Sequence, residues 1–406
     1  MDKVKKRVPK LRFPGFVGEW EEKKLEGLLE FKNGLNAKKE QYGKGVKFIN
    51  VLDILNNEYI TYDKIVGSVD IDDATVNNYL VNFGDILFQR SSETREEVGS
   101  ACVYLDRNRP AIFGGFVIRG KKIGEYNPIF LNKLLKTSLS RDLITSKSGG
   151  STRYNVGQDI LSSIILPFPS LPEQQKIADF LTAVDARIQQ LTRKKELLAE
   201  YKKGVMQKIF SQEIRFKDEN GKDFPEWEEK KLGNYIDEYK KNSDKNDEYE
   251  VFTSSNKGLM RQSEYYGENR ITERDNVGFN IIPPGYITYR SRSDNRRFTF
   301  NINNLGVIGI ISTYYPVFQI INGNNKFFIE FANFYQHIFG KYSVGTSQQV
   351  LSLNDLRSIK FKLPCSHEQQ KIADFLTEID NKIDQFGQQL EKMQSWKKGL
   401  LQQMFV

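Results

Sequence analysis

Two segments of the chain place apolar side chains at alternating spacings of three and four residues, the pattern of a helix with one narrow apolar stripe. Only Lys195 and Lys202 interrupt the first stripe, and Lys397 interrupts the second. The two stripes together are called the helix seam. Its residues in the first segment are Ile177, Leu181, Val184, Ile188, Leu191 and Leu198, and in the second segment Ile372, Leu376, Ile379, Ile383, Phe386 and Leu390. At 1.5 Å per residue, a helix of about 38 residues extends roughly 57 Å. The matched lengths and stripes predict that the two helices pack on each other.

The helical segments belong to a longer internal repeat. Residues Glu173–Thr182 return letter for letter as Glu368–Thr377, and Glu19–Leu25 returns as Glu226–Leu232. The repeated unit is therefore a globular region followed by a long helix. We expect a first globular domain at 1–171, a long helix at 172–210, a linker at 211–224, a second globular domain at 225–366 and a second long helix at 367–406.

The globular regions show short alternating segments bounded by turn residues, which predict strands. We expect strands at Val46–Leu52, Gly84–Arg90, Ala101–Leu105, Phe113–Ile118, Tyr249–Thr253, Tyr286–Arg290, Phe298–Ile302 and Gly306–Ser312. One helix is expected in each region, at Pro128–Leu143 and at Asn325–Phe339. The predicted fold class is α+β, with two similar domains that each contain a mostly antiparallel sheet.

Composition narrows the choice of partners. The chain has 406 residues, a formal charge of +8 and 12% aromatic residues, which favours an acidic partner such as nucleic acid. Two cysteines form neither a disulfide framework nor a metal-ligand pattern, which fits a cytoplasmic location. The basic segment 1–10 lacks the apolar run of a signal peptide, and no stretch is long and apolar enough to span a membrane.

Polar, basic loops follow equivalent predicted strands in the two repeats, at 88–95 and 289–297. Related glycine-containing loops precede the long helices, at 148–155 and 343–349. Arginine forks onto guanine or phosphate, glutamine and asparagine suit adenine, and hydroxyl groups bind phosphate. The candidate DNA-binding residues are Gln89, Arg90, Ser91, Ser92, Arg95, Thr152, Arg153, Tyr154, Arg290, Ser291, Arg292, Asn295, Arg296, Arg297, Thr346, Ser347 and Gln348. A solvated surface loop is the alternative interpretation of each.

Catalytic interpretations have little support, and we expect no catalytic residue, metal ligand or bound cofactor on this chain. Histidine occurs only as His337 and His367, too few to build a nucleophile pair in each repeat. The segment Asn127–Phe130 partly matches the Asn-Pro-Pro-aromatic motif of amino-methyltransferases, but it lacks the second proline and opens a predicted helix. No nucleotide-binding glycine loop is present.

Two variable regions, each followed by a near-identical Glu-Gln-Gln-Lys-Ile-Ala-Asp-Phe-Leu helix, resemble the specificity subunit of a type I restriction–modification system. The resemblance covers residues 13–210 and 224–406. It implies two target-recognition domains that each read one half of a bipartite, asymmetric double-stranded DNA site, and an antiparallel coiled-coil spacer. It also implies partner subunits: modification subunits, two in number, which carry S-adenosylmethionine and methylate adenine, and restriction subunits with motor and nuclease activity.

Two other functions are compatible with parts of the sequence. A protein interaction scaffold could use duplicated domains whose basic loops only confer solubility. A fused methyltransferase fragment would need the cofactor motifs that this sequence lacks. DNA binding that is sequence-specific and strengthens with a separate methyltransferase chain distinguishes the specificity subunit from both.

Overall fold

The computed structural model describes residues 7–150, 152–267 and 275–406. The first six residues of the basic N-terminal segment 1–10, and Ser151 of the loop 148–155, lie outside the described residues. The chain divides into two compact units, of which the first contains Met1–Thr192 and Gln388–Val406 and the second contains Arg193–Gly387. Each unit holds one globular domain and one end of each long helix, so the predicted α+β class with two domains is confirmed.

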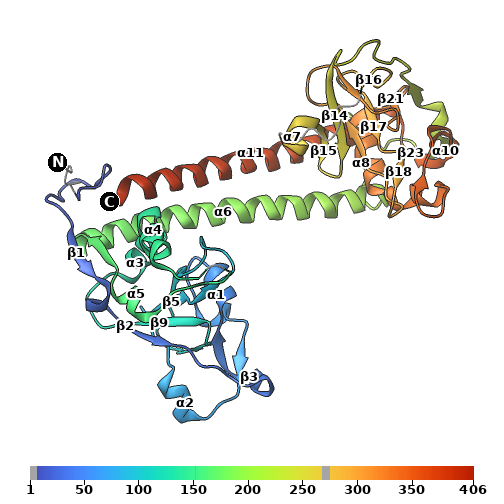
Figure 1. Ribbon diagram of the computed structural model, residues 1–406. Helices are drawn as coiled ribbons and strands as arrows, with labels where there is room; N and C mark the ends of the chain where they lie inside the picture. Colours follow the sequence, from blue (N-terminus) through green and yellow to red (C-terminus); the bar gives the residue numbers. More distant parts are fainter. Residues whose placement is uncertain (1–6, 151, 268–274) are drawn as a thin grey trace. The chain divides into compact units, whose positions relative to one another are not determined.

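The first unit contains a four-stranded sheet of order β2-β9-β5-β7 and a three-stranded sheet of order β4-β3-β8 (Figure 1). Its strands are β1 Glu21–Lys24, β2 Leu29–Asn33, β3 Tyr42–Ile49, β4 Ser68–Val69, β5 Ile86–Gln89, β6 Ser91–Ser92, β7 Ala101–Val103, β8 Ile112–Phe113, β9 Val117–Lys122, β10 Tyr154–Asn155 and β11 Ile165–Phe168. Its short helices are α1 Val51–Leu55, α2 Asp73–Asn78, α3 Pro128–Leu135, α4 Ser138–Lys147 and α5 Gln158–Ser162.

The second unit contains two four-stranded sheets, of order β13-β21-β17-β19 and β15-β14-β20-β16. Its strands are β12 Glu228–Lys231, β13 Ile236–Glu238, β14 Glu250–Ser255, β15 Gly258–Arg261, β16 Asn280–Ile282, β17 Ile287–Tyr289, β18 Arg292–Ser293, β19 Phe300–Ile302, β20 Gly309–Ile311, β21 Val317–Ile320, β22 Gln349–Val350 and β23 Lys360–Leu363. Its short helices are α7 Gln262–Tyr266, α8 Asn325–Phe334, α9 Gln336–Phe339 and α10 Leu353–Ser358. The named strands pair antiparallel except for β3 with β8 and β14 with β20.

Polar groups end two of the predicted elements earlier than expected, and a third predicted element is divided in two. The single helix expected at 128–143 is two helices, since Thr137 adopts an extended backbone and its hydroxyl caps α4 by accepting from the amide of Ser140. The strand expected at 46–52 ends at Ile49, where the amide of Asn50 donates to Asp53 and α1 begins. The helix expected at 325–339 is likewise divided, at Tyr335.

The long helices are α6 Leu171–Phe210 and α11 Ser366–Met404. In the first unit, the start of α6 shares one apolar core with the end of α11, which includes Ile177 and Leu400. In the second unit, the end of α6 and the start of α11 share another core, which includes Ile209 and Ile372. The helices therefore run antiparallel. Within the described residues, none of the helices combines the length and apolar character needed to cross a membrane.

The predicted seam residues are not equally buried. Those that belong to a domain core are buried: Ile177, Leu181, Val184, Ile372, Leu376 and Ile379. Leu191, at the middle of α6, is also buried, although neither core includes it. Those nearer the middle of each helix are half-buried: Ile188, Leu198, Ile383, Phe386 and Leu390. The domain cores thus provide much of the burial that stabilises these helices.

Two of the three lysines that interrupt the stripes, Lys202 and Lys397, form equivalent ion pairs, whereas Lys195 is exposed. Lys202 Nζ lies 2.7 Å from Asp380 Oδ2 and 2.9 Å from Glu330 Oε1 of α8. Lys397 Nζ lies 2.7 Å from Asp185 Oδ1, and Asp185 also pairs with the buried Lys133 of α3. Since Lys202 and Lys397 each have a carboxylate on the opposite helix, these two interruptions do not leave unpaired charge in a half-buried seam.

The exact repeat Glu-Gln-Gln joins each long helix to its own domain. Gln174 donates to the carbonyl of Pro169 at 2.9 Å and accepts from the amide of Asn127, the N-cap of α3, at 3.0 Å. Gln369 does the same with Pro364 and Asn324, the N-cap of α8, at 3.0 and 3.1 Å. The bonds to the two carbonyls are buried and those from the two amides are part-buried, and enclosed backbone groups need a partner, which accounts for a glutamine at this position in both repeats.

The preceding glutamates bind arginine. The carboxylate of Glu173 accepts hydrogen bonds from Nε and Nη2 of Arg12, at 2.8 and 2.7 Å. The carboxylate of Glu368 accepts from the same atoms of Arg215, at 3.3 and 2.9 Å, and from the indole nitrogen of Trp227 at 3.1 Å. The linker predicted at 211–224 therefore contributes a charge that the start of α11 requires.

We expect Arg215→Ala to lower the free energy of unfolding of the second unit by about 3 kcal/mol, because it leaves the buried Glu368 carboxylate without its cation. Urea unfolding followed by tryptophan fluorescence measures the change. Glu226, the exposed second partner of Arg215, is the matched control, and Glu226→Ala should change the free energy by less than about 1 kcal/mol. Equal effects of the two substitutions would contradict the assignment.

Glu58 makes the first unit sensitive to acid. Burial opposes its ionisation, but Lys136 and Lys133 outweigh burial and lower the pKa of Glu58 from its ordinary value of 4.5 to about 2. The folded state therefore gains stability from this carboxylate above pH 4.5 and loses it as the pH falls towards 2. Burial instead raises the pKa of Glu330, which pairs with Lys202 in the second unit.

Hydrogen-exchange mass spectrometry between about pH 6 and pH 3 checks this difference, after correction for the intrinsic exchange rate. Protection of α3 should fall with acid in the parent chain. In Glu58→Gln, protection should be lower at neutral pH and depend less on pH. Glu330→Gln is the control, and an identical acid response in that variant and in Glu58→Gln would contradict the special role of Glu58.

Candidate nucleic-acid interface

Each domain brings its two predicted basic loops together through a short antiparallel ladder. In the first domain, β6 pairs with β10, with Ser92 opposite Tyr154. In the second, β18 pairs with β22, with Ser293 opposite Gln349. Sequence reasoning proposed the loops separately, and the ladders show that the loops of each domain form one surface.

The two ladders are equivalent in their hydrogen bonds. The amide of Val156 donates to the carbonyl of Arg90 at 3.0 Å, and the amide of Leu351 donates to the carbonyl of Ser291 at 2.9 Å. A serine hydroxyl closes the turn that follows in each domain. Ser92 Oγ accepts from the amide of Thr94 at 3.2 Å. In the second domain, Ser293 Oγ accepts from Asn295 at 3.4 Å and Arg297 at 3.1 Å.

Side chains on this shared backbone differ between the domains. Equivalent positions hold Gln89 and Arg290, Arg90 and Ser291, and Ser91 and Arg292. The backbone bonds that fix the ladder do not depend on these side chains. The same frame can therefore present different donors and acceptors in each domain, which is what recognition of two different base sequences requires.

Two of the predicted residues lie inside the domain. Gln89 is only 3% exposed and donates to the carbonyl of Ser91 at 3.1 Å. Ser92 is buried and its hydroxyl lies within hydrogen-bonding distance of Glu97. Arg95 is exposed, but its guanidinium donates to the carbonyl of Thr145 in α4 at 3.1 Å. Gln89 and Ser92 position the loop and are removed from the proposed contacts.

The other candidates are accessible. Exposed members are Arg90, Thr152, Arg153, Arg290, Asn295, Arg296, Arg297, Thr346 and Ser347. Half-buried members are Tyr154, Ser291, Arg292 and Gln348. Ser91 is half-buried as a residue, but its hydroxyl oxygen is enclosed and has no hydrogen-bond partner among the described residues, so Ser91 is also removed from the proposed contacts. The guanidinium of Arg292 is stacked over the ring of Tyr314, 4.0 Å from its centroid, which orients this arginine.

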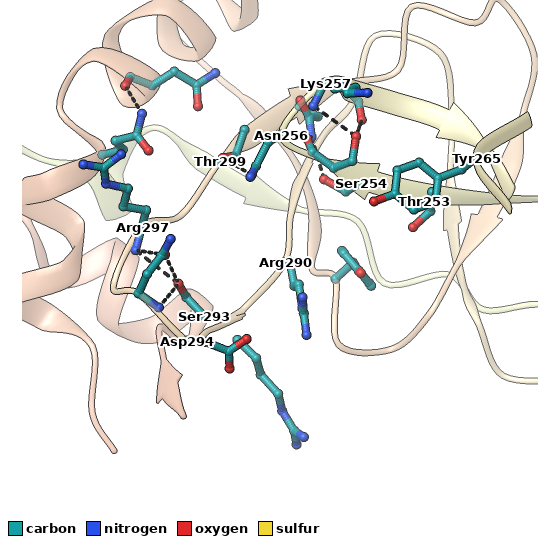
Figure 2. A pocket seen from close by; sticks show the side chains of 18 of the residues that line it. Thr253, Ser254, Asn256, Lys257, Tyr265, Arg290, Ser293, Asp294, Arg297 and Thr299 are labelled. Carbon is teal, nitrogen blue, oxygen red and sulfur yellow. Dashed lines mark hydrogen bonds between the residues drawn. The ribbon is translucent and has the colours of Figure 1, made fainter. Parts of the chain in front are cut away.

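A polar hollow of about 920 Å³ opens beside the ladder of the second domain. Figure 2 shows Arg290, Arg297, Asp294 and Lys257 around it. With Arg292, four cationic side chains face one carboxylate, so the hollow favours an anionic ligand. Burial raises the pKa of Tyr315 in its lining, an effect that Arg290 opposes.

One wall of this hollow was not predicted. It is formed by the turn between β14 and β15, with Asn256 and Lys257, and by Tyr265 and Tyr266 of α7. The Ser-Ser-Asn-Lys-Gly sequence at 254–258 is a recognisable turn signal. Nothing in the sequence, however, places that turn against residues 290–297, because the contact depends on the order of strands.

The segment that partly matches a methyltransferase motif has a structural role. Asn127 caps α3, its side-chain oxygen accepting from the amide of Phe130 at 3.0 Å, and its amide nitrogen donates to Gln175 at 2.7 Å. Among the described residues, no group of three or more histidine, cysteine, aspartate or glutamate side chains is arranged to hold a metal ion.

The family described as the type I restriction modification DNA specificity domain matches the chain twice, at residues 18–199 and 221–394. A relative with the name putative type I restriction enzyme MjaX specificity subunit, from Methanocaldococcus jannaschii, is 25% identical over 94% of this chain and 92% of its own length. The MjaVIII specificity subunit of the same organism is 25% identical over 65% of this chain and 66% of its own length.

Solved structures share the fold. The S subunit of a type I restriction-modification system from M. genitalium has a TM-score of 0.57 and 18% identity, over 98% of this chain and 99% of that chain. The HsdS subunit from Thermoanaerobacter tengcongensis has a TM-score of 0.50 and 15% identity, over 97% of both chains. At these identities the comparison establishes the fold.

Proposed function

The chain belongs to the type I restriction modification DNA specificity family, and we propose that each of its two domains reads one half of a bipartite, asymmetric DNA site. The chain is the sequence-recognition subunit of a type I system rather than an enzyme. The observation that carries the proposal is the shared ladder with different polar and basic side chains. One backbone used twice with different donors and acceptors serves recognition of two different base sequences.

We propose the DNA contacts from exposure and charge. In the first domain these are Arg90, Thr152, Arg153 and Tyr154, with Arg95 at the edge of the surface. In the second they are Arg290, Ser291, Arg292, Asn295, Arg296, Arg297, Thr346, Ser347 and Gln348. Arginines supply forked contacts to guanine or phosphate, whereas the hydroxyl groups and amides supply neutral donors and acceptors.

The family role implies partners that this chain positions on DNA. We propose that two modification subunits bind the spacer helices, hold S-adenosylmethionine and methylate adenine in the recognised site. Restriction subunits with motor and nuclease activity join the same complex, and the complex works in the cytoplasm. A protein interaction scaffold that does not bind DNA remains the alternative outcome of the experiments below.

Methylation mapping tests the proposed function directly. Genomic DNA from cells with and without the gene, and with the modification subunit present, should differ by adenine methylation at one split sequence. That sequence then serves as a duplex probe. The purified chain should bind it more tightly when the modification subunit is added. The absence of both a methylated site and of DNA binding by the complex would support the scaffold.

Arg292→Ala should relax specificity at one base position, and only in the half-site read by the second domain. A lost forked contact to a base costs about 1–3 kcal/mol, whereas a lost phosphate contact weakens all sequences alike and lowers the salt slope by about one. Binding of every single-base variant of the site at two salt concentrations separates these outcomes.

Arg357→Ala is the matched control for this substitution. Arg357 lies in α10 of the same domain, pairs with Glu238 and lies outside the ladder, so its loss should leave both affinity and base preference unchanged. A change of preference in the half-site read by the first domain would contradict the assignment of Arg292.

The purified chain without partners should show no methyltransferase, nuclease or ATPase turnover. The physical reason is that the chemistry resides on the partner subunits, while this chain supplies geometry. Assays with S-adenosylmethionine or ATP and the mapped duplex check the expectation, with the assembled complex as the positive control. Turnover by the isolated chain would contradict it.

A further inference from the structure

Each domain exposes one large aromatic side chain in the turn that precedes a central sheet strand. Phe116 lies between β8 and β9 and is 62% exposed. Tyr314 lies between β20 and β21 and is 51% exposed. Neither residue was among the candidate DNA contacts. Phe116 was expected within a strand at 113–118, but the chain turns there between β8 and β9 and exposes the ring.

These two aromatic residues occupy the same position of the shared frame. The carbonyl of Phe116 accepts from the amide of Arg90 at 2.9 Å. The carbonyl of Tyr314 accepts from the amide of Ser291 at 3.1 Å and from its hydroxyl at 2.7 Å. Arg90 and Ser291 are equivalent ladder residues, as the bonds from Val156 and Leu351 show. Each aromatic residue is therefore fixed at the edge of the proposed DNA-contact surface of its domain.

The surroundings of these rings favour DNA over a protein partner. The guanidinium of Arg292 covers the Tyr314 ring, and Arg90 Nη1 lies 3.4 Å from the carbonyl of Gly115, next to Phe116. Apolar rings beside arginine are suited to the base edges exposed in a groove of the duplex, above all to the methyl group of thymine.

We infer that Phe116 and Tyr314 contact nucleobases, Phe116 in the half-site of the first domain and Tyr314 in that of the second. The inference rests on the proposed function and adds an uncharged contact to it. Apolar and stacking contacts release no counterions, so they contribute affinity that salt does not screen. The arginines position each domain on the duplex, while the rings contact the edges of the bases.

Phe116→Ala and Tyr314→Ala, each in the complex with modification subunits, test the inference on the mapped duplex. Each should weaken binding on the order of tenfold, with the slope of affinity against salt unchanged. Tyr314→Phe should retain binding. The matched controls are Ile123→Ala and Ile321→Ala, since these exposed residues follow β9 and β21 at the opposite ends of the same strands. They should bind like the parent chain.

Photocrosslinking identifies the ligand of each ring. A benzophenone-bearing phenylalanine analogue at position 116 should crosslink to bases of one half-site, and the same analogue at position 314 to bases of the other. Unchanged affinity in the alanine variants, a reduced salt slope, or crosslinks only to the modification subunit would overturn the inference. In each of those cases, sequence-specific binding by the parent complex would leave the proposed function intact.

Discussion

The first turn of each long helix is held to its globular domain by buried side chains that have a single arrangement of partners. Gln174 and Gln369 each join three elements: the end of a strand, the start of the long helix and the N-cap of a domain helix. Because the polar groups involved are buried, a substitution leaves at least two of them unpaired. Rotation of the domain about the first turn of its helix would break the same bonds. This attachment makes the direction of each domain surface a property of the helix that carries it.

A fixed attachment allows the remaining surface to diverge. The ladders that carry the candidate DNA contacts are held by backbone bonds, by a buried serine hydroxyl and by the core beneath them. None of these depends on whether Arg90 or Ser291 occupies the equivalent outer position, or on the other exposed side chains of each loop. The contact side chains can therefore change without loss of the fold, which suits a protein that must recognise different sequences with the same architecture.

The ion pairs between the two long helices compensate buried charge and also fix how the helices are aligned along each other. Lys202 with Asp380, and Lys397 with Asp185, place opposite charges across a half-buried seam at equivalent positions. A shift of one helix by a turn would bury these charges without partners, at a cost of several kcal/mol per ion. An apolar seam alone would tolerate such a shift more easily. The pairs therefore favour one alignment, and Glu330 and Glu58 extend that choice into the domains.

Local pattern in the sequence determined the repeat, the two long helices, the α+β class and the positions of the basic loops. Helix periodicity and turn chemistry act over a few residues, so they are visible before any tertiary contact exists. Tertiary structure alone decided that Gln89 and Ser92 face inward, that Lys257 approaches the arginine loop, and that Phe116 and Tyr314 occupy equivalent positions, each in its own domain. It also decided that the stripe-breaking Lys202 has its carboxylate on the other helix, 178 residues away. Each of these facts depends on which distant segments meet, and burial and charge pairing between such segments leave no periodic trace in the chain.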